Sequence, residues 1–282
     1  MKIFLVAHRG ALGDFVLTWP TLALLRWKYS DHQFVGVGRP EYLKLAQEMG
    51  LIDIGYDAES AEMMPLFSGE AMPKLLSATA SALLWIGEDE KVRRLLGQTC
   101  SGPFHVHAPF PEQGEHVMDY HLQCLPYFSL PAISEEEPFF PLDTRREDYA
   151  LIHPGSGSES KNYDPEFYAF LANELKNKRF PDTRIVIGPT EKNLKALYNG
   201  RFTVVETESV TELARLLSRA SLFIGNDSGV SHLSALLGTR TLALFKGENH
   251  IRWGVRGREA QSLEAMSEAQ AMTRIQKALV DT

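Results

Sequence analysis

Cysteine is scarce in this 282-residue chain, which contains only Cys100 and Cys124. Two cysteines this far apart match neither a disulfide framework nor a metal-ligand spacing, so a reducing cytoplasm is the expected compartment. No apolar run approaches the ~18 residues that span a bilayer, and residues 1–7 are too short for the apolar core of a signal peptide. At most a peripheral contact with the inner face of the cytoplasmic membrane is therefore expected.

An excess of positive charge is also missing. The net charge is −7, and residues 1–145 contain 11 Lys and Arg against 19 Asp and Glu, whereas residues 146–282 contain 18 against 17. Proteins that bind nucleic acid present a basic face, so nucleic acid is not an expected partner. The acidic first half likewise offers no obvious patch for anionic lipid headgroups.

The usual nucleotide-cofactor motifs are absent as well. Residues 8–14 read HRGALGD, which is neither a GxGxxG dinucleotide fingerprint nor a phosphate loop with its lysine, so NAD and ATP hydrolysis are poorly supported and no cofactor is expected. Gly10 and Gly13 still predict a turn in which the backbone can approach a ligand. Asp14 is either a helix-start charge that interacts with the dipole or a base at the end of the first strand.

Hydrophobic residues make up 44% of the chain and charged residues 23%, as in ordinary globular proteins. Apolar strands alternate with helical patterns, which predicts an α/β fold with parallel sheets. The acidic, proline-rich stretch 129–146 is interpreted as a linker between domains 1–145 and 146–282, or else as a surface loop. The expected strands are 1–7, 34–38, 51–54, 82–86, 149–152, 184–187, 203–206, 222–224 and 241–245, and the expected helices are 17–27, 40–49, 73–82, 88–96, 119–127, 165–175, 210–218, 230–237 and 263–279.

The stretch 222–238 predicts a strand, a tight turn (GNDSG) and a helix. Asp227 or Ser228 can cap the helix, and Gly229 lets the backbone approach a ligand. The free N–H groups at such a helix start favour a phosphate, and His232 lies one turn further on the same helix face. The pattern therefore indicates a diphosphate site, although many such turns in α/β proteins are only connections.

A second polar loop follows the strand at 149–152 and reads HPGSGSESKNYDPE over residues 153–166. Ser156, Gly157 and Lys161 supply hydroxyl and backbone donors and a mobile cation, which suit a phosphate, although a lone lysine in a polar loop is usually only solvated. Asp164 followed by Pro165 predicts a helix start.

Four histidines, at positions 105, 107, 116 and 121, raise the question of a metal site. No cysteine accompanies them closely and the segment between them contains prolines, so a metal site is not favoured. No Asp-x-Asp motif is present to hold a divalent ion. We expect no bound metal.

Taken together, the motifs resemble those of the glycosyltransferase family 9 heptosyltransferases, the ADP-heptose:lipopolysaccharide type. The resemblance covers nearly the whole chain and rests on 9–14 (RGALGD), 153–157 (HPGSG) with Lys161, and 225–235 (GNDSGVSHLSA). It implies the GT-B fold, in which two Rossmann-like domains with parallel sheets face each other across a cleft. The chain departs from the family at 163–165, where members usually have Trp-Pro, and at 253–256, where they have a proline-rich stop.

The resemblance also implies roles for particular residues. Asp14, in domain 1–145, would be the general base on the acceptor hydroxyl. Domain 146–282 would bind the donor, with Glu191 near the nucleoside and Lys161 and His232 replacing a metal at the diphosphate. The remaining donor-binding residues would be Ser156, Gly157, Asp227, Ser228 and Gly229.

The implied activity is inverting, metal-independent transfer of a sugar, expected to be heptose, from a nucleotide-diphosphate donor such as ADP-heptose. The acceptor would be the lipopolysaccharide core or another glycan. Two alternatives remain open. A sugar-nucleotide 2-epimerase of the GT-B fold is expected to have a glutamate soon after the glycine, where this chain has 230–232 (VSH). A catalytically degenerate nucleotide-binding module is the other alternative.

Overall fold

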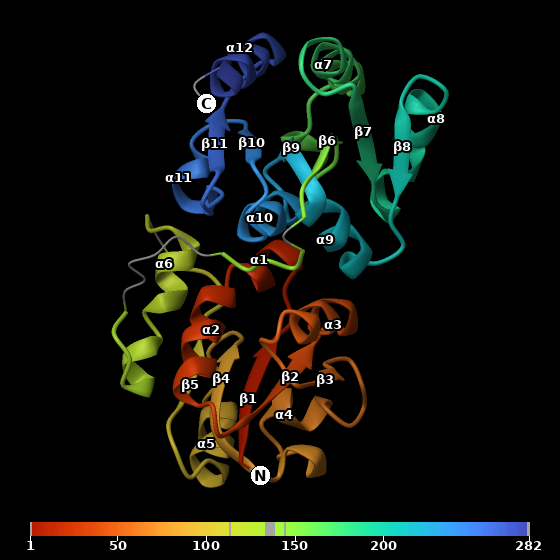
Figure 1. Ribbon diagram of the computed structural model, residues 1–282. Helices are drawn as coiled ribbons and strands as arrows, with labels where there is room; N and C mark the ends of the chain where they lie inside the picture. The colour runs from red at the N-terminus through yellow and green to blue at the C-terminus, as the bar shows by residue number, and fades with distance from the viewer. Residues whose placement is uncertain (1, 113, 133–138, 144, 281–282) are drawn as a thin grey trace. The chain divides into compact units, whose positions relative to one another are not determined.

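The computed structural model describes residues 2–112, 114–132, 139–143 and 145–280 (Figure 1). The chain divides into two compact units, Met1–Glu135 and Glu136–Thr282. Each unit contains a parallel β-sheet with helices between the strands, so the predicted α/β class with parallel sheets is confirmed. The division falls within the predicted linker 129–146, of which residues 133–138 and 144 lie outside the described part.

In the described part of the first unit, five parallel strands run in the order β3-β2-β1-β4-β5. The strands are β1 (Ile3–His8), β2 (Gln33–Gly38), β3 (Ile54–Asp57), β4 (Thr79–Trp85) and β5 (Phe104–His107). The helices are α1 (Leu12–Val16), α2 (Trp19–Lys28), α3 (Pro40–Glu48), α4 (Met64–Ser68), α5 (Glu90–Thr99) and α6 (Val117–Leu122), with short 3-10 turns η1 (Lys74–Leu76) and η2 (Leu125–Phe128).

The central strand β1 is buried along its whole length, which explains its unbroken apolar sequence. Leu5 packs on one face of the sheet in a cluster that includes residues of α4 and α5. Phe4 points to the other face, where its ring stacks on Phe34 at 4.7 Å and lies 5.5 Å from Phe128 of η2. The sheet is therefore covered on both faces, and β1 ends with its last residue, His8, at the carboxyl edge.

In the described part of the second unit, six strands run in the order β11-β10-β9-β6-β7-β8, again with parallel pairing. The strands are β6 (Glu147–His153), β7 (Asp182–Ile187), β8 (Thr203–Glu206), β9 (Ala220–Asn226), β10 (Thr241–Phe245) and β11 (Ala260–Glu264). The helices are α7 (Pro165–Lys178), α8 (Lys195–Tyr198), α9 (Val210–Arg219), α10 (Gly229–Leu236), α11 (Asn249–Trp253) and α12 (Glu268–Val280), with η3 (Glu159–Lys161) and η4 (Pro189–Leu194).

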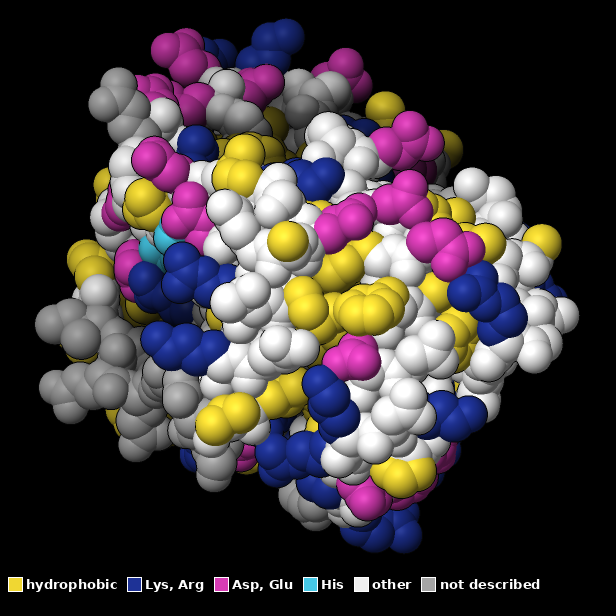
Figure 2. Space-filling view, turned by 90° about the horizontal axis from the view of Figure 1, so that it is seen from above, with side chains coloured by type: hydrophobic (Ala, Val, Ile, Leu, Met, Phe, Trp, Pro, Cys, Tyr) yellow, Lys and Arg dark blue, Asp and Glu magenta, His cyan; other side chains and the backbone are white. Residues whose placement is uncertain are grey.

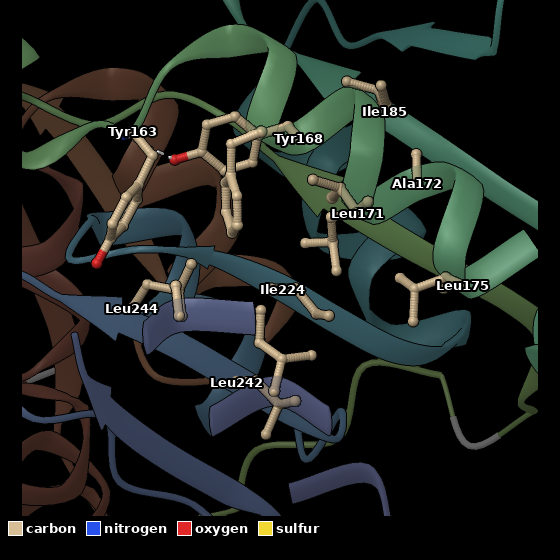
Figure 3. Packing of buried hydrophobic residues seen from close by; sticks show 14 of the residues in the cluster. Tyr163, Tyr168, Leu171, Ala172, Leu175, Ile185, Ile224, Leu242 and Leu244 are labelled. Carbon is tan, nitrogen blue, oxygen red and sulfur yellow. Dashed lines mark hydrogen bonds between the residues drawn. The ribbon is translucent and has the colours of Figure 1, made fainter. Parts of the chain in front are cut away.

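Helix α7 begins where the sequence predicts. The Asp164 carboxylate accepts a hydrogen bond from the Glu166 N–H at 2.9 Å, and Pro165 occupies the first helical position. The buried face of α7 then packs on the sheet, and Figure 3 shows Leu171 and Leu175 pointing toward the strands that carry the core residues of β9 and β10. Helix α12 adds residues to the same core, so α7 and α12 cover one face of the sheet.

The chain enters the second unit as a segment fastened to it. The Phe140 N–H donates to the Leu236 carbonyl oxygen at 2.7 Å, and the Phe139 ring lies against Gly238, where φ is +77°. The Arg146 guanidinium donates to carbonyl oxygens at the ends of α9 and α10, those of Ser218, Ala220 and Gly238, and to the Thr239 hydroxyl. The described residues of the predicted linker from 139 onward therefore belong structurally to the second unit.

Several expected elements are wrong or displaced. The helix expected over 73–82 is instead η1 followed by β4, because pairing with β1 places residues 79–85 in the sheet. The strand expected at 51–54 begins only at Ile54, since the Asp53 carboxylate holds the preceding turn through the Phe34 N–H and the Arg26 side chain. The helix expected over 119–127 breaks into α6 and η2 before Pro126, and that over 263–279 starts at Glu268, after the edge strand β11.

Candidate functional site

In the first unit, Asp14 lies at the carboxyl edge of the sheet, in the first turn of α1, the helix that follows β1. Its Oδ2 atom accepts a hydrogen bond from the Ala11 N–H at 3.0 Å, so the carboxylate closes the first turn of α1. Gly10 is required at this turn, because a Cβ atom there would lie 2.9 Å from Asp14 Oδ2 and 2.7 Å from His8 Cε1. Gly13 lies one residue before Asp14, inside α1. The carboxylate is thus held in one place and is half-buried.

In the second unit, the end of β9 is organised by Asn226, whose side chain is completely buried. Its Nδ2 atom donates to the Pro154 carbonyl oxygen at 2.9 Å and to Asn162 Oδ1 at 3.1 Å, while its Oδ1 atom accepts from the Tyr168 hydroxyl at 2.6 Å. Its own carbonyl oxygen accepts from the Ser231 hydroxyl at 2.5 Å. One amide side chain therefore ties the loop after β6 to the turn that leads into α10.

The turn itself starts α10 as the sequence predicts. The Ser228 side chain accepts a hydrogen bond from the Ser231 N–H at 3.4 Å and is the N-cap, and Gly229 is the first helical residue. His232 follows on the first turn and is buried, with its N–H donating to the Ser228 carbonyl oxygen at 3.3 Å. Ser228, the first N–H groups of the helix and His232 therefore all belong to the first turn of α10, where the helix dipole favours an anion.

Lys161 reaches the same turn from the loop after β6. Its Nζ atom lies 2.8 Å from Asp227 Oδ2, and Asn249 Nδ2 donates to that same oxygen at 2.5 Å. Because the Lys161 side chain is 42% exposed, this ion pair contributes little to stability, at most about 1 kcal/mol. The main effect of this ion pair is to hold the Lys161 ammonium beside the start of α10.

Glu191, on η4 after β7, is buried against the loop after β6. Its Oε2 atom accepts from the Gly188 N–H at 2.9 Å and lies 3.6 Å from His153 Nε2. A Cβ atom at Gly155 would lie only 2.1 Å from Glu191 Oε1, so only glycine allows this approach. Glu191 therefore sits beside the carboxyl ends of β6 and β7, the edge at which open α/β sheets bind ligands.

Ser156 and Gly157 lie in the same loop but are more exposed. The Ser156 hydroxyl donates to the Ser158 carbonyl oxygen at 2.7 Å and accepts from the Ser158 N–H at 3.2 Å. A Cβ atom at Gly157 would meet no atom within 4 Å, so no neighbour demands glycine there. Beyond this loop, Lys246, which follows β10, donates through Nζ to the Asn162 carbonyl oxygen and brings a second lysine to this edge.

The four histidines of residues 105–121 take structural positions in the first unit. The His105 ring stacks on Tyr127 at 3.8 Å, His116 caps α6 by accepting from the Met118 N–H at 3.2 Å, and His121 is fully buried with its ring 5.8 Å from that of His107. Burial lowers the pKa of His105 and of His107 to about 4. Within the described residues no group of three or more His, Cys, Asp or Glu is placed to hold a metal ion.

A pocket of about 440 Å³ opens on the second unit between α7 and α12. The residues lining this pocket include Phe167, Phe170, Met272 and Glu268. On the face of the molecule seen in Figure 2, hydrophobic side chains lie among acidic and basic ones. None of the predicted site residues lines the pocket.

No helix among the described residues has the length and apolar character needed to cross a membrane.

Two α/β units, each with a parallel sheet and polar loops at the carboxyl edge of that sheet, define the GT-B fold class, and solved structures share this fold. A glycosyl transferase family 9 protein from Veillonella parvula matches with a TM-score of 0.78 at 16% identity, over 100% of this chain and 98% of that one. The E. coli heptosyltransferase WaaC with ADP matches with a TM-score of 0.75 at 16% identity, over 98% and 100% of the two chains. The predicted GT-B fold is thereby confirmed.

The family model of glycosyltransferase family 9 (heptosyltransferase) matches residues 115–280, and this chain belongs to that family. Lipopolysaccharide heptosyltransferase 1 of Campylobacter coli is 31% identical over 114 residues, which cover 36% of this chain and 32% of that protein. The match thus spans about a third of that curated relative. The predicted resemblance to family 9 is confirmed.

Sequence reasoning missed the residues that brace the second-unit site. Asn226 lies in the GNDSG turn, but no motif marks its buried side chain, and its partner Tyr168 lies within the expected helix 165–175. Asn249 lies in a segment without a recognised motif. The available signal was an amide at the end of the buried strand β9, because a polar side chain at that position is buried and needs partners.

Proposed function

We propose that this protein transfers heptose, with inversion, from ADP-heptose to a hydroxyl of a lipopolysaccharide core or related glycan. The observation that carries the proposal is the position of the Lys161 ammonium, 2.8 Å from Asp227 beside the start of α10. This arrangement suits a diphosphate, and the family relative WaaC was solved with ADP and with ADP-2-deoxy-2-fluoro heptose.

The second unit would bind the donor. The N–H groups at the start of α10, the Ser228 hydroxyl and the His232 ring would contact the diphosphate, and Lys161 would turn from Asp227 to a phosphate oxygen. These groups stabilise the negative charge that develops on the departing ADP. Glu191, buried beside the loop after β6, would face the nucleoside, and Ser156, Gly157 and Gly229 would let the backbone approach the donor.

The first unit would supply the base. In the transfer step the acceptor oxygen bonds to the anomeric carbon, the bond from that carbon to the diphosphate oxygen breaks, and the acceptor proton passes to the Asp14 carboxylate. Inversion follows from attack on the face opposite the leaving group. Asp14 is suited to this role because the Ala11 N–H, 3.0 Å from Oδ2, holds the carboxylate at the carboxyl edge of the sheet.

The reaction is proposed to need no divalent metal, since Lys161, His232 and the start of α10 would meet the diphosphate charge. Turnover in the presence of EDTA should equal turnover of the untreated protein. A loss that added Mg²⁺, Mn²⁺ or Fe²⁺ reverses would contradict this part of the proposal.

Donor binding is tested by thermal shift and calorimetry with ADP, UDP and GDP. ADP should raise the unfolding temperature most, because a ligand that binds only the folded state stabilises it. Lys161→Ala should weaken ADP binding by about tenfold or more, as expected for a lost charge-assisted contact, whereas Lys176→Ala on the exposed face of α7 should not. Equal effects of the two variants would contradict the role of Lys161.

The base is tested by comparing Asp14→Asn with Asp14→Ala. Asparagine keeps an oxygen for the Ala11 N–H but cannot take up the acceptor proton, so both variants should lose transfer while both retain ADP affinity. Substantial transfer by Asp14→Asn would rule out the base. Nucleotide affinity without turnover of the unmodified protein, over a panel of glycan acceptors, would instead favour a binding module.

A further inference from the structure

His8 is placed to act on Asp14 through the backbone between them. The His8 Nδ1 atom accepts a hydrogen bond from the Gly10 N–H at 3.2 Å, and the next N–H, that of Ala11, donates to Asp14 Oδ2 at 3.0 Å. Two successive amides of one turn are therefore held by two different side chains. A shift of the first bond moves the donor of the second.

The turn leaves little room for such a shift. A Cβ atom on Gly10 would lie 2.7 Å from His8 Cε1 on one side and 2.9 Å from Asp14 Oδ2 on the other. The His8 imidazole and the Asp14 carboxylate therefore both pack against Gly10. Any change in the position of the ring is transmitted to the carboxylate across a single residue.

His8 is itself rigidly placed. Its backbone pairs with Gly38 of β2 and Trp85 of β4, at the end of the central strand. Its ring is buried, with its centroid 5.5 Å from that of Phe15 on α1. The position of the turn before Asp14 is therefore set by the central strand of the sheet and not by a mobile surface group.

The ring is also in the protonation state that this bond requires. Burial, and to a lesser extent the Arg39 charge, lower the pKa of His8 to about 4, so the imidazole is neutral at pH 7. The titratable group facing it from α6 is His121, which is likewise neutral because burial depresses its pKa. A neutral ring that accepts at Nδ1 carries its proton on Nε2.

We propose that His8 is a positioning residue for the Asp14 carboxylate, acting as the hydrogen-bond acceptor that fixes the Gly10–Ala11 turn. This inference rests on the proposed role of Asp14 as the base. Its effect is expected in kcat, because a misplaced base slows the chemical step while leaving the donor site on the second unit unchanged.

Two substitutions separate the acceptor from the rest of the ring. Asparagine places its Oδ1 atom close to the position of Nδ1 and commonly accepts from the N–H two residues on, as in an Asx-turn. Glutamine places its amide close to Nε2 and cannot make that bond. His8→Asn should therefore rescue the turn, whereas His8→Gln and His8→Ala should not.

The first measurement needs no substrate. In protein labelled with 15N-glycine, the Gly10 amide should exchange slowly in the wild type and in His8→Asn, and at least about tenfold faster in His8→Gln, since a lost hydrogen bond opens the site to solvent. A Gly10 amide that exchanges as fast as an exposed one in the wild type would overturn the inference. So would equal protection in the asparagine and glutamine variants.

The second measurement is turnover with ADP-heptose and a lipopolysaccharide-core acceptor. We expect His8→Gln and His8→Ala to lose about 10- to 100-fold in kcat with a donor KM changed less than about threefold, and His8→Asn to recover most of that loss. A loss confined to KM, or no rescue by asparagine, would overturn the inference.

Failure of the two proposals can be told apart with Asp14→Asn in the same assay. Wild-type turnover by Asp14→Asn would show that Asp14 is not the base, whatever His8 does. An inactive Asp14→Asn, together with full kcat in His8→Gln and His8→Ala, would leave the base in place and overturn only the role of His8.

Discussion

Removal of one hydroxyl, in Tyr168→Phe, should measurably destabilise the second unit. The Tyr168 oxygen donates to Asn226 Oδ1 at 2.6 Å and accepts from the Tyr163 N–H at 3.2 Å, and all three residues are buried. Phenylalanine fills the same space but leaves both partners unsatisfied. A buried polar group without a partner costs about 1–3 kcal/mol, so the two together should lower the free energy of unfolding by roughly 2–4 kcal/mol.

The matched control is Tyr198→Phe. Tyr198 is also buried in the core of the second unit, but its hydroxyl makes one bond, to the Pro165 carbonyl oxygen at 3.0 Å at the start of α7. Its loss should cost only about 1 kcal/mol, the usual net value of one hydrogen bond. The comparison therefore isolates the second partner of Tyr168 from the general effect of removing a tyrosine hydroxyl.

Both variants are best measured by urea unfolding, with hydrogen exchange in peptides covering β9 and α7 to assign the loss to the second unit. Since Asn226 holds the Pro154 carbonyl at 2.9 Å, in the loop that contains Lys161, Tyr168→Phe should also weaken ADP binding. A stability loss no larger than that of Tyr198→Phe would refute the argument, because the Asn226 network would then contribute nothing beyond one bond.

Two other predictions concern a glycine and a histidine. Gly155→Ala should lower the free energy of unfolding by about 1–3 kcal/mol, because the new Cβ would lie 2.1 Å from Glu191 Oε1. Gly157→Ala is the control and should be nearly neutral, because its Cβ would meet no atom within 4 Å. Equal urea midpoints for the two variants would contradict this prediction. Burial lowers the pKa of His8 in the folded state to about 4, below its ordinary value of 6.5, so the stability that His8 contributes is fully present above pH 6.5 and is lost as the pH falls toward 4. Urea unfolding at pH 7.5 and 4.5 should show that His8→Asn loses about 2–3 kcal/mol less than the wild type over this interval, and equal losses would show that His8 does not titrate in this way.

The parts of the fold that could be predicted are those in which local sequence and tertiary environment agree. Strand β1 is apolar because both of its faces are covered, and α7 carries its own cap at Asp164 and its own proline at the first position. The opposite holds for residues 73–82, where leucines and alanines favour a helix. There, pairing with β1 outweighs the local preference and makes a strand from Thr79 onward.

Strand β5 could not have been found from its pattern, since the sequence FHVH resembles a polar loop. His105 and His107 lie in the sheet because aromatic rings, those of Tyr127 and Tyr120, cover them at 3.8 and 4.3 Å. Tyr120 and Tyr127 lie more than ten residues beyond the histidines that they cover, so the local sequence around β5 gives no sign of this burial.

The residues of the candidate site likewise fall into those that local sequence reveals and those that depend on tertiary packing. The motifs that contain Asp14, Lys161 and Ser228 are recognisable because each combines turn residues with a polar group at a strand end. The network around Asn226 is not recognisable, because the direction of the Tyr168 hydroxyl depends on how α7 packs against β9. Sequence therefore indicates which loops carry polar groups, and packing decides which of those groups are held in place.

The attachment of Arg146 also determines where this protein can be cut. A fragment intended to represent the second unit alone would lose four hydrogen bonds at the ends of α9 and α10 if it began at Glu147, and it would leave Gly238 without the covering ring of Phe139. Expression trials of the second unit should therefore start upstream of residue 139, so that the segment containing Phe139 and Arg146 remains attached to it.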